Sequence, residues 1–316
     1  MKITTLLPLL ALVSSQLLSG CSAKQQDDLL QTITEWGREH SDLTLHSAQA
    51  EDVEMSYLER RRTGPTLVML HGFSANKDTW LHLAADLPED YTLFAPDFAG
   101  HGDSSIAADG NYDLEKQVER LHALLEMQNL EQFHLAGNSM GGAIATLYAM
   151  KYPEEIKSLI LIDAAGVDGK NKSPFFTMLE KGENVLIATD KESFERRMDL
   201  ILEKPPLIPW PIRPALVRMT INNAEINKEI FADMMATRER LKGEDYRLAM
   251  SKELTMPVQI LWGSDDHILD VSAVDEFKRY LPQAEVVIFD GIGHVPMVEA
   301  PGKTADAVTD FVGRHL

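Results

Sequence analysis

A chain of 316 residues, of which 44% are hydrophobic and 25% charged, has the composition of an ordinary globular protein with one large core or two smaller ones. The net charge of −19 argues against a nucleic-acid partner, because proteins that bind phosphate backbones need clustered Lys and Arg. No apolar run of about 18 residues or more follows the N-terminal segment, so we expect no membrane-spanning helix beyond it.

The N-terminus has the pattern of a secretory signal. Met1 and Lys2 precede an apolar stretch over residues 3–18, which gives a charged n-region and an apolar h-region. Leu18-Ser19-Gly20-Cys21 closes this stretch, and Cys21 is the only cysteine of the chain. The tetrapeptide resembles the bacterial lipobox, in which the cysteine is diacylated and becomes the first residue of the mature protein.

This resemblance implies that residues 1–20 are a lipoprotein signal peptide and that Cys21 carries a lipid anchor. The chain would then be an exported bacterial lipoprotein attached to a membrane, and Ser22 resembles the residue expected in proteins sorted to the outer membrane. The alternative is a secreted protein in which Cys21 is an incidental buried cysteine. In either case stability must come from the core, because a single cysteine forms no intramolecular disulfide.

Two regions precede the main domain. Residues 21–42 are mostly polar and predict either an amphipathic helix beside the anchor or a linker helix that packs on the domain. The apolar residues that recur there near helical spacing are Leu29, Leu30, Ile33 and Trp36. The alternating pattern over residues 43–60 predicts an antiparallel hairpin.

After residue 65, apolar strands alternate with helices. Continuous apolar runs predict strands buried on both faces, and the alternation is typical of a parallel sheet covered by helices on two sides. The strands expected in this part are residues 66–73, 92–98, 132–138 and 158–166, with helices near 78–87, 112–129 and 140–151.

The strand signal disappears between residues 167 and 252, where Met, Leu, Phe and Pro at helical spacing predict a helical insertion. The alternation then resumes with strands at 257–266 and 284–294 and helices at 271–281 and 302–315. We therefore expect one α/β domain with a doubly wound, mostly parallel sheet, built from residues 43–166 and 253–316, and a helical cap at 167–252.

Within these segments we place the strands themselves at 132–138, 257–263 and 284–290, and polar residues follow each of them at its carboxyl end, where ligands bind in such a sheet. Ser139 comes first, Asp265 and Asp266 come next, and His294 comes last, which is the chain order of a Ser-Asp-His triad. Residues 137–141 read GNSMG and fit G-x-S-x-G, a sharp strand-to-helix turn that exposes a nucleophilic serine. The alternative is an ordinary N-cap serine.

A second loop follows the first parallel strand and reads MLHGFSANKDTW over residues 69–80. An oxyanion hole needs two preorganised N–H donors, and our candidates are the backbone amides of Phe73 and Met140. We expect His71 to order this loop rather than to act as a base. His101, in GHGDSS, is interpreted as a structural loop histidine.

The motifs HGFSANKD, DFAGHGDS, GNSMGG, LWGSDDHI and GIGH resemble those of the α/β-hydrolase family. Together with the leader, they make the chain most similar to the bacterial family V lipases and esterases. GNSMGG is shared with hydrolases that cleave carbon–carbon bonds in meta-cleavage products, whereas the leader and the 69–80 loop favour the lipase branch. The resemblance implies the α/β-hydrolase fold from about residue 43 to residue 316.

By this resemblance, Ser139 is the nucleophile, His294 the general base and an aspartate the residue that orients the histidine. Asp266 occupies the register W-G-x-x-D that is common in the family. Asp265 is one residue early, with its side chain expected to point outward. Asp163 is a third option, because some relatives take their acid from the earlier strand, although we interpret it as a loop-ordering carboxylate.

The expected substrate is an apolar ester, either an acylglycerol or another fatty acyl ester. Apolar residues of the cap that could line an acyl pocket are Phe175, Phe176, Met178, Leu179, Leu207, Ile208, Trp210, Leu216 and Met219. No metal-binding or dinucleotide motif is present, so no cofactor and no metal are expected. The alternatives are a carbon–carbon bond hydrolase, a short-chain esterase and a catalytically inactive binding module on the same fold.

Overall fold

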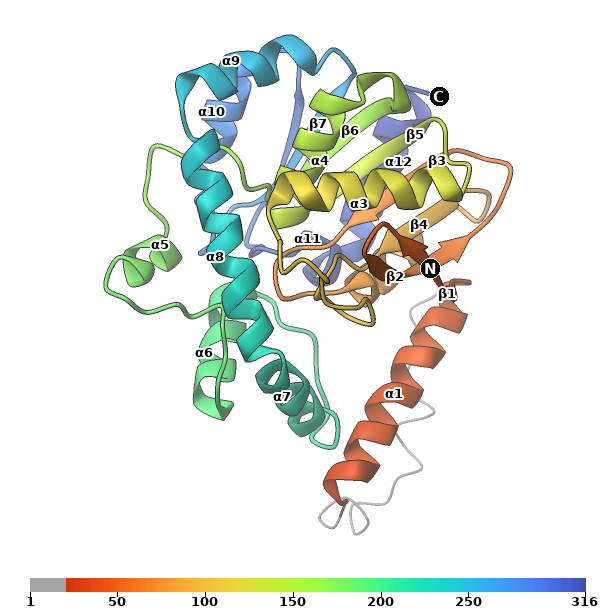
Figure 1. The fold of residues 1–316 in the computed structure, drawn as a ribbon, viewed down its shortest axis with the longest axis vertical. Helices are drawn as coiled ribbons and strands as arrows, with labels where there is room; N and C mark the ends of the chain where they lie inside the picture. The colour runs from red at the N-terminus through yellow and green to blue at the C-terminus, as the bar shows by residue number, and fades with distance from the viewer. Residues whose placement is uncertain (1–20) are drawn as a thin grey trace.

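The computed structural model describes residues 21–316, so the expected signal peptide at 1–20 lies outside the described residues. One eight-stranded sheet has the order β1-β2-β4-β3-β5-β6-β7-β8 (Figure 1). The β1–β2 and β2–β4 pairs are antiparallel and the remaining pairs are parallel, which confirms the expected hairpin and the mostly parallel sheet. The strands are β1 (Thr44–Ala50), β2 (Val53–Arg60), β3 (Thr66–Leu70), β4 (Thr92–Pro96), β5 (Phe133–Asn138), β6 (Ile156–Ile162), β7 (Val258–Gly263) and β8 (Glu285–Phe289).

Helices cover both faces of this sheet. They are α2 (Leu81–Asp86), α3 (Leu114–Met127), α4 (Met140–Lys151), α10 (Ala273–Tyr280), α11 (Pro296–Glu299) and α12 (Pro301–Gly313), with short 3₁₀ turns η3 (Lys77–Trp80) and η4 (Pro153–Glu155). In β3, Val68 and Leu70 belong to one core with α3 and α4, whereas Leu67 and Met69 belong to a second core with α2 and α12. The apolar run of β3 therefore reflects a strand buried on two sides. The edge strand β8 differs from this expectation, because Val286 and Ile288 on one of its faces are exposed.

Helices fill the region between β6 and β7, where the sequence predicts a helical insertion. They are α5 (Pro174–Leu179), α6 (Lys191–Ile201), α7 (Arg213–Asn222), α8 (Ala224–Leu241) and α9 (Glu244–Glu253). In Figure 1, α5, α6, α7 and α8 lie together to one side of the sheet. The function of this region as a cap remains an interpretation.

Helix α1 (Ala23–His40) precedes the sheet and projects away from it (Figure 1). Ser22 caps its first turn. Arg38 forms an ion pair with Asp78 at 2.7 Å, and Arg218 of α7 donates to the side chain of Gln26, so α1 contacts both the core and the insertion. Its exposed apolar residues are Leu29, Ile33 and Trp36. Over residues 21–316, no helix has the length and apolar character needed to cross a membrane.

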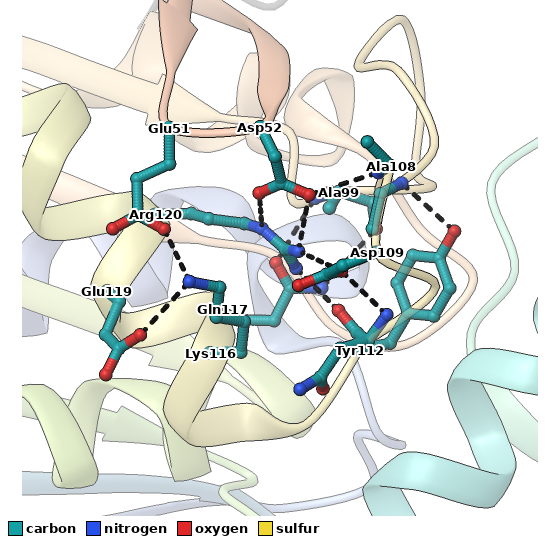
Figure 2. A network of polar contacts seen from close by, with 12 residues as sticks. Glu51, Asp52, Ala99, Ala108, Asp109, Tyr112, Lys116, Gln117, Glu119 and Arg120 are labelled. Atoms are coloured by element: carbon teal, nitrogen blue, oxygen red, sulfur yellow. Dashed lines mark hydrogen bonds and ion pairs between the residues drawn. The ribbon is translucent and has the colours of Figure 1, made fainter.

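A polar network holds the β1–β2 turn against α3 (Figure 2). The Arg120 guanidinium is fully buried and makes a two-point ion pair with Asp52 at 2.8 and 2.9 Å. It also contacts Asp109 at 2.9 Å, and Lys116 contacts Glu51 at 2.7 Å. The hydrogen bond from Arg120 lowers the pKa of Asp52, so this pair favours the ionised carboxylate and pins the edge of the sheet to the helix.

Candidate active site

Ser139 occupies the turn between β5 and α4 in a strained conformation. Its φ is 55° and its ψ is −119°, a combination that residues other than glycine rarely adopt. The turn also needs its flanking glycines. A Cβ on Gly137 would lie 2.2 Å from the carbonyl oxygen of Gly141, and a Cβ on Gly141 would lie 2.2 Å from that of Leu70. The glycines of GNSMGG therefore allow the close backbone approaches that this turn requires.

His294 and Asp266 form a buried pair after β8 and β7. Nδ1 of His294 lies 2.7 Å from Oδ2 of Asp266, and because a carboxylate only accepts, Nδ1 carries the hydrogen. Oδ1 of Asp266 accepts from the backbone N–H groups of Ile268 and Leu269 at 2.7 and 3.0 Å. These donors orient the carboxylate, which in turn leaves Nε2 of His294 as the nitrogen that can take a proton.

Asn138 connects the serine turn to the histidine loop. Its Nδ2 donates to the carbonyl oxygens of His294 and Ile162, at 3.1 Å in each case. The backbone N–H of Ser139 also donates to the carbonyl of Ile162 at 3.1 Å. The structure thus joins the turn after β5 and the loop after β8 at the carboxyl edge of the parallel strands.

Asp266 is the acid candidate that contacts the histidine. Asp265 is exposed, as the sequence predicts. Asp163 is fully buried, has a φ of 42°, and accepts from the backbone N–H of Gly263 at 2.9 Å. Burial, and secondly the charge of Asp266, raise the pKa of Asp163 well above its ordinary value. Asp163 therefore orders the loop after β7 as a buried carboxyl whose neutral form is favoured.

Ligand atoms of Asp163, Asp266 and His294 lie within 4.8 Å of one another, which is close enough to share a metal ion. The imidazole nitrogen on this side is already committed, because Nδ1 of His294 donates its hydrogen to Asp266. A metal ligand must instead be a deprotonated nitrogen. The cluster therefore fits an acid–base pair of Asp266 and His294, with a neutral carboxyl of Asp163 beside it. That the protein needs no metal and no cofactor stays a prediction.

The two oxyanion candidates are placed beside the serine. Met140 is the first residue of α4, and Phe73 follows Gly72, whose added Cβ would lie 3.1 Å from Cβ of Ser139. Within residues 21–316, neither the Phe73 nor the Met140 N–H donates a hydrogen bond to another group. Both donors are therefore available to an oxyanion that forms next to the serine.

His71 and His101 order the loops around these donors. Nδ1 of His71 donates to the carbonyl of Gly72 at 2.8 Å, and Nε2 accepts from the N–H of Phe98 at 3.2 Å. Burial lowers the pKa of His71 to about 4 and that of His101 to about 3, so both rings are neutral near pH 7. These contacts agree with the structural roles that the sequence predicts.

The helical insertion contributes contacts that no sequence motif predicts. The backbone N–H of His294 donates to the carbonyl of Ile201, the last residue of α6, at 2.9 Å. Arg197 of α6 donates to the carbonyl of Ser74 at 3.2 Å, and Asn227 of α8 donates to the Ser74 hydroxyl at 3.0 Å. The insertion therefore touches both the histidine loop and the oxyanion loop.

The similarity to known proteins with this architecture extends over nearly the whole chain. Lipase 1 of Psychrobacter immobilis is 36% identical over 286 residues, covering 89% of this chain and 88% of that protein. A monoacylglycerol lipase of Mus musculus is 30% identical and covers 98% of this chain and 92% of its own length. The crystal structure of a membrane phospholipase A, a bacterial virulence factor, has a TM-score of 0.86 and 37% identity, covering 92% of each chain.

A family model described as the alpha/beta hydrolase fold matches residues 65–204, which include β3 to β6 and the serine turn. The full-length relatives and the topology extend this match to the strands that precede Asp266 and His294. The chain belongs to the α/β-hydrolase family.

Proposed function

We propose that this protein is a serine-dependent carboxylic ester hydrolase of the lipase type, acting on acylglycerols or other fatty acyl esters. The observation that carries the proposal is the buried 2.7 Å contact between His294 and Asp266, at the sheet edge where Ser139 holds its strained turn. Similarity over most of the chain to proteins named lipase and monoacylglycerol lipase supports the substrate class.

In the mechanism that we infer, Nε2 of His294 takes the proton of Ser139 while the serine oxygen attacks the ester carbonyl. Asp266 holds the imidazole in the productive tautomer and stabilises the imidazolium. The N–H groups of Phe73 and Met140 stabilise the oxyanion of the tetrahedral intermediate. The alcohol leaves with the proton from His294, and the same histidine then activates the water that hydrolyses the acyl-enzyme.

Aromatic side chains of the insertion lie beside the oxyanion loop, and their position supports a substrate with an apolar acyl group. The ring of Phe231 in α8 lies 5.5 Å from that of Phe73 and 6.4 Å from that of Phe175 in α5, and all three residues are buried. Buried aromatic contacts of this kind place apolar groups beside the oxyanion loop, which favours an acyl chain over a charged group there. Leu207 and Trp210 do not fit the expected pocket, because the chain between α6 and α7 leaves them 93% and 50% exposed.

We further propose that Cys21 anchors the mature protein to the cell envelope, at the outer membrane. The lipobox-like sequence LSGC and the serine that follows it support this localisation. Cys21 lies two residues before α1, whose exposed apolar residues Leu29, Ile33 and Trp36 share one face by their spacing. A helix with such a face next to a lipid chain is suited to a membrane surface.

Hydrolysis of p-nitrophenyl esters from acetate to palmitate tests the proposed activity. The wild-type protein should hydrolyse them, and Ser139→Ala should lower kcat by at least about 10⁴-fold. Ser47→Ala, at an exposed serine of β1, is the matched control and should behave as the wild type. Turnover that survives in Ser139→Ala would refute the proposal. Turnover of a meta-cleavage diketone without ester turnover would favour the carbon–carbon hydrolase.

A further inference from the structure

A large groove lies between α1, α6, α7 and the loops that contain residues 74–79 and 100–103. Its volume is about 1030 Å³. Helices α1 and α7, which both contribute lining residues, lie toward the lower end of the view in Figure 1. The apolar side chains that line it include Leu30, Phe194, Met198 and Leu216. Three arginines, Arg38, Arg197 and Arg218, also line it. The groove therefore combines an apolar surface with cationic groups.

Arg197 differs from the other two arginines because it has no acidic partner. Arg38 pairs with Asp78 at 2.7 Å, and Arg218 pairs with Asp27. Across the described part of the chain, the only side-chain hydrogen bond of Arg197 runs from Nη2 to the carbonyl of Ser74, and its buried Nε has no partner. The residue is only 9% exposed. A buried guanidinium without a counterion is unfavourable unless a ligand pairs with it.

Burial lowers the pKa of Arg197 to about 10, so the guanidinium still carries its charge near pH 7. The groove also contains four carboxylates. Those of Asp27, Asp78 and Asp103 are each engaged by another cation, and that of Glu35 accepts from Gln31, so none of them pairs with Arg197. A ligand anion is thus the group that would complete the site around Arg197.

The position of Arg197 links this groove to the catalytic serine. Its partner Ser74 follows Phe73 directly, and an added Cβ on Gly72 would lie 3.1 Å from Cβ of Ser139. Ser74 has a φ of 55° and is also held through its hydroxyl by Asn227. An anion at Arg197 therefore lies against the loop that supplies a proposed oxyanion donor.

We propose that Arg197 binds the phosphate of a glycerophospholipid whose acyl ester is cleaved at Ser139. This inference rests on the proposed ester hydrolase function and extends it to a substrate with an anionic headgroup. In such a lipid the phosphodiester is a few bonds from the nearest acyl ester, and its oxygens accept paired N–H donors from a planar guanidinium. The apolar side chains of the groove cover the adjoining hydrocarbon.

A free fatty acid is a weaker match to the same guanidinium. Its carboxylate is the product of the reaction and forms at Ser139, so it does not extend from the ester toward Arg197. A neutral acylglycerol would leave the guanidinium unpaired. The phosphate of the lipid is thus the anion whose place in the substrate fits both the serine and the arginine.

The test compares phosphatidylglycerol with a diacylglycerol of the same acyl chains, in mixed micelles, with the full-length protein. We expect Arg197→Met to lower the ratio of the two kcat/KM values by about tenfold to about a hundredfold, because charge-assisted hydrogen bonds contribute that much. Arg197→Lys, which keeps the charge and loses the planar fork, should give an intermediate ratio. Arg196→Met is the matched control, since Arg196 lies on the same helix, is paired with Glu183 and does not line the groove.

A second measurement uses inorganic phosphate as a competitor of diacylglycerol hydrolysis. Phosphate should inhibit the wild type and have less effect on Arg197→Met. An equal fall in kcat/KM for both lipids in Arg197→Met would overturn the proposal. Arg197 would then be a residue that only holds the loop at Ser74. Inhibition by octanoate but not phosphate, with an unchanged ratio, would assign the site to a fatty acid instead. Failure of the wild type on both lipids would count against the ester hydrolase function itself.

Discussion

The side-chain amide of Asn138 donates to the backbone carbonyl of His294 at 3.1 Å, so the residue before the proposed nucleophile holds the proposed base. The opposite backbone group of His294, its N–H, donates to Ile201 at the end of α6. The histidine is therefore fixed from the core on one side and from the helical insertion on the other. Its ring is oriented separately by Asp266.

Asn138→Ala should weaken both stability and catalysis. The substitution leaves the buried carbonyls of His294 and Ile162 without this donor, which costs about 1–3 kcal/mol of unfolding free energy. Because the histidine loop loses its support, kcat should fall more than KM rises. Urea unfolding and steady-state kinetics measure the two effects, with Gln132→Ala at an exposed amide as the control. A loss of stability with unchanged kcat would show that Asn138 has no part in positioning the base.

Three aspartate-to-asparagine variants identify the triad acid. Asp266→Asn should fold normally and lower turnover by roughly 10⁴-fold, because the amide favours the wrong tautomer of His294. The turnover of Asp265→Asn and of Asp163→Asn should remain within about tenfold of the wild type, because neither carboxylate forms a hydrogen bond with the His294 ring. Steady-state kinetics on the three purified proteins decides the assignment. Near-normal turnover in Asp266→Asn would move the acid to another residue.

Asp163 should make stability depend on pH in a direction opposite to a salt-bridged aspartate. Its pKa is raised in the folded state from the ordinary 3.8, so the unfolded chain releases this proton first as the pH rises. The stability of the wild type should then fall relative to Asp163→Asn as the pH rises above the unfolded pKa of 3.8, by up to about 1.4 kcal/mol per pH unit until the folded pKa is passed.

Urea unfolding of both proteins at several pH values measures this difference, with Asp265→Asn at an exposed carboxylate as the control. A stability difference between wild type and Asp163→Asn that is constant with pH would mean that Asp163 ionises in the folded protein as it does in the unfolded chain.

Cys21→Ser should release the protein from membranes. The proposed anchor combines diacylglyceryl and N-acyl chains, which exceeds the roughly two signals that stable attachment needs. Membrane fractionation with fatty-acid labelling compares this variant with Ser22→Ala, which should keep the label. A wild-type protein that incorporates no fatty acid and fractionates with soluble proteins would contradict the anchor.

The sheet could be predicted because every buried parallel strand is an apolar run. The apolar segments at 66–73, 257–266 and 284–294 run beyond the observed strand ends at Leu70, Gly263 and Phe289, although the polar residues already place the last two ends near 263 and 290. The extra residues leave the sheet to form the loops that carry Phe73, Asp266 and His294. Hydrophobicity alone cannot show where hydrogen bonding to the neighbouring strand stops.

The contacts of the helical insertion could not be predicted from the sequence. Arg197 lies in the segment KESFERRMDL, whose many charges are typical of an exposed helix. It is buried because α6 packs against the loop with Ser74, more than a hundred residues earlier in the chain. Asp163 likewise ends an apolar strand, and its burial beside Asp266 depends on the pairing of β6 with β7.

Trapping of the acyl-enzyme tests the central claim most directly. The wild-type protein is mixed with p-nitrophenyl butyrate, quenched in acid within the first turnover, and digested for peptide mass spectrometry. We predict a butyryl group on the peptide that contains Ser139 in the wild type, and none in Ser139→Ala. A His294→Ala variant should carry more label than the wild type only if the substitution slows deacylation more than acylation. Hydrolysis of the ester without any acyl group on Ser139 would contradict the account.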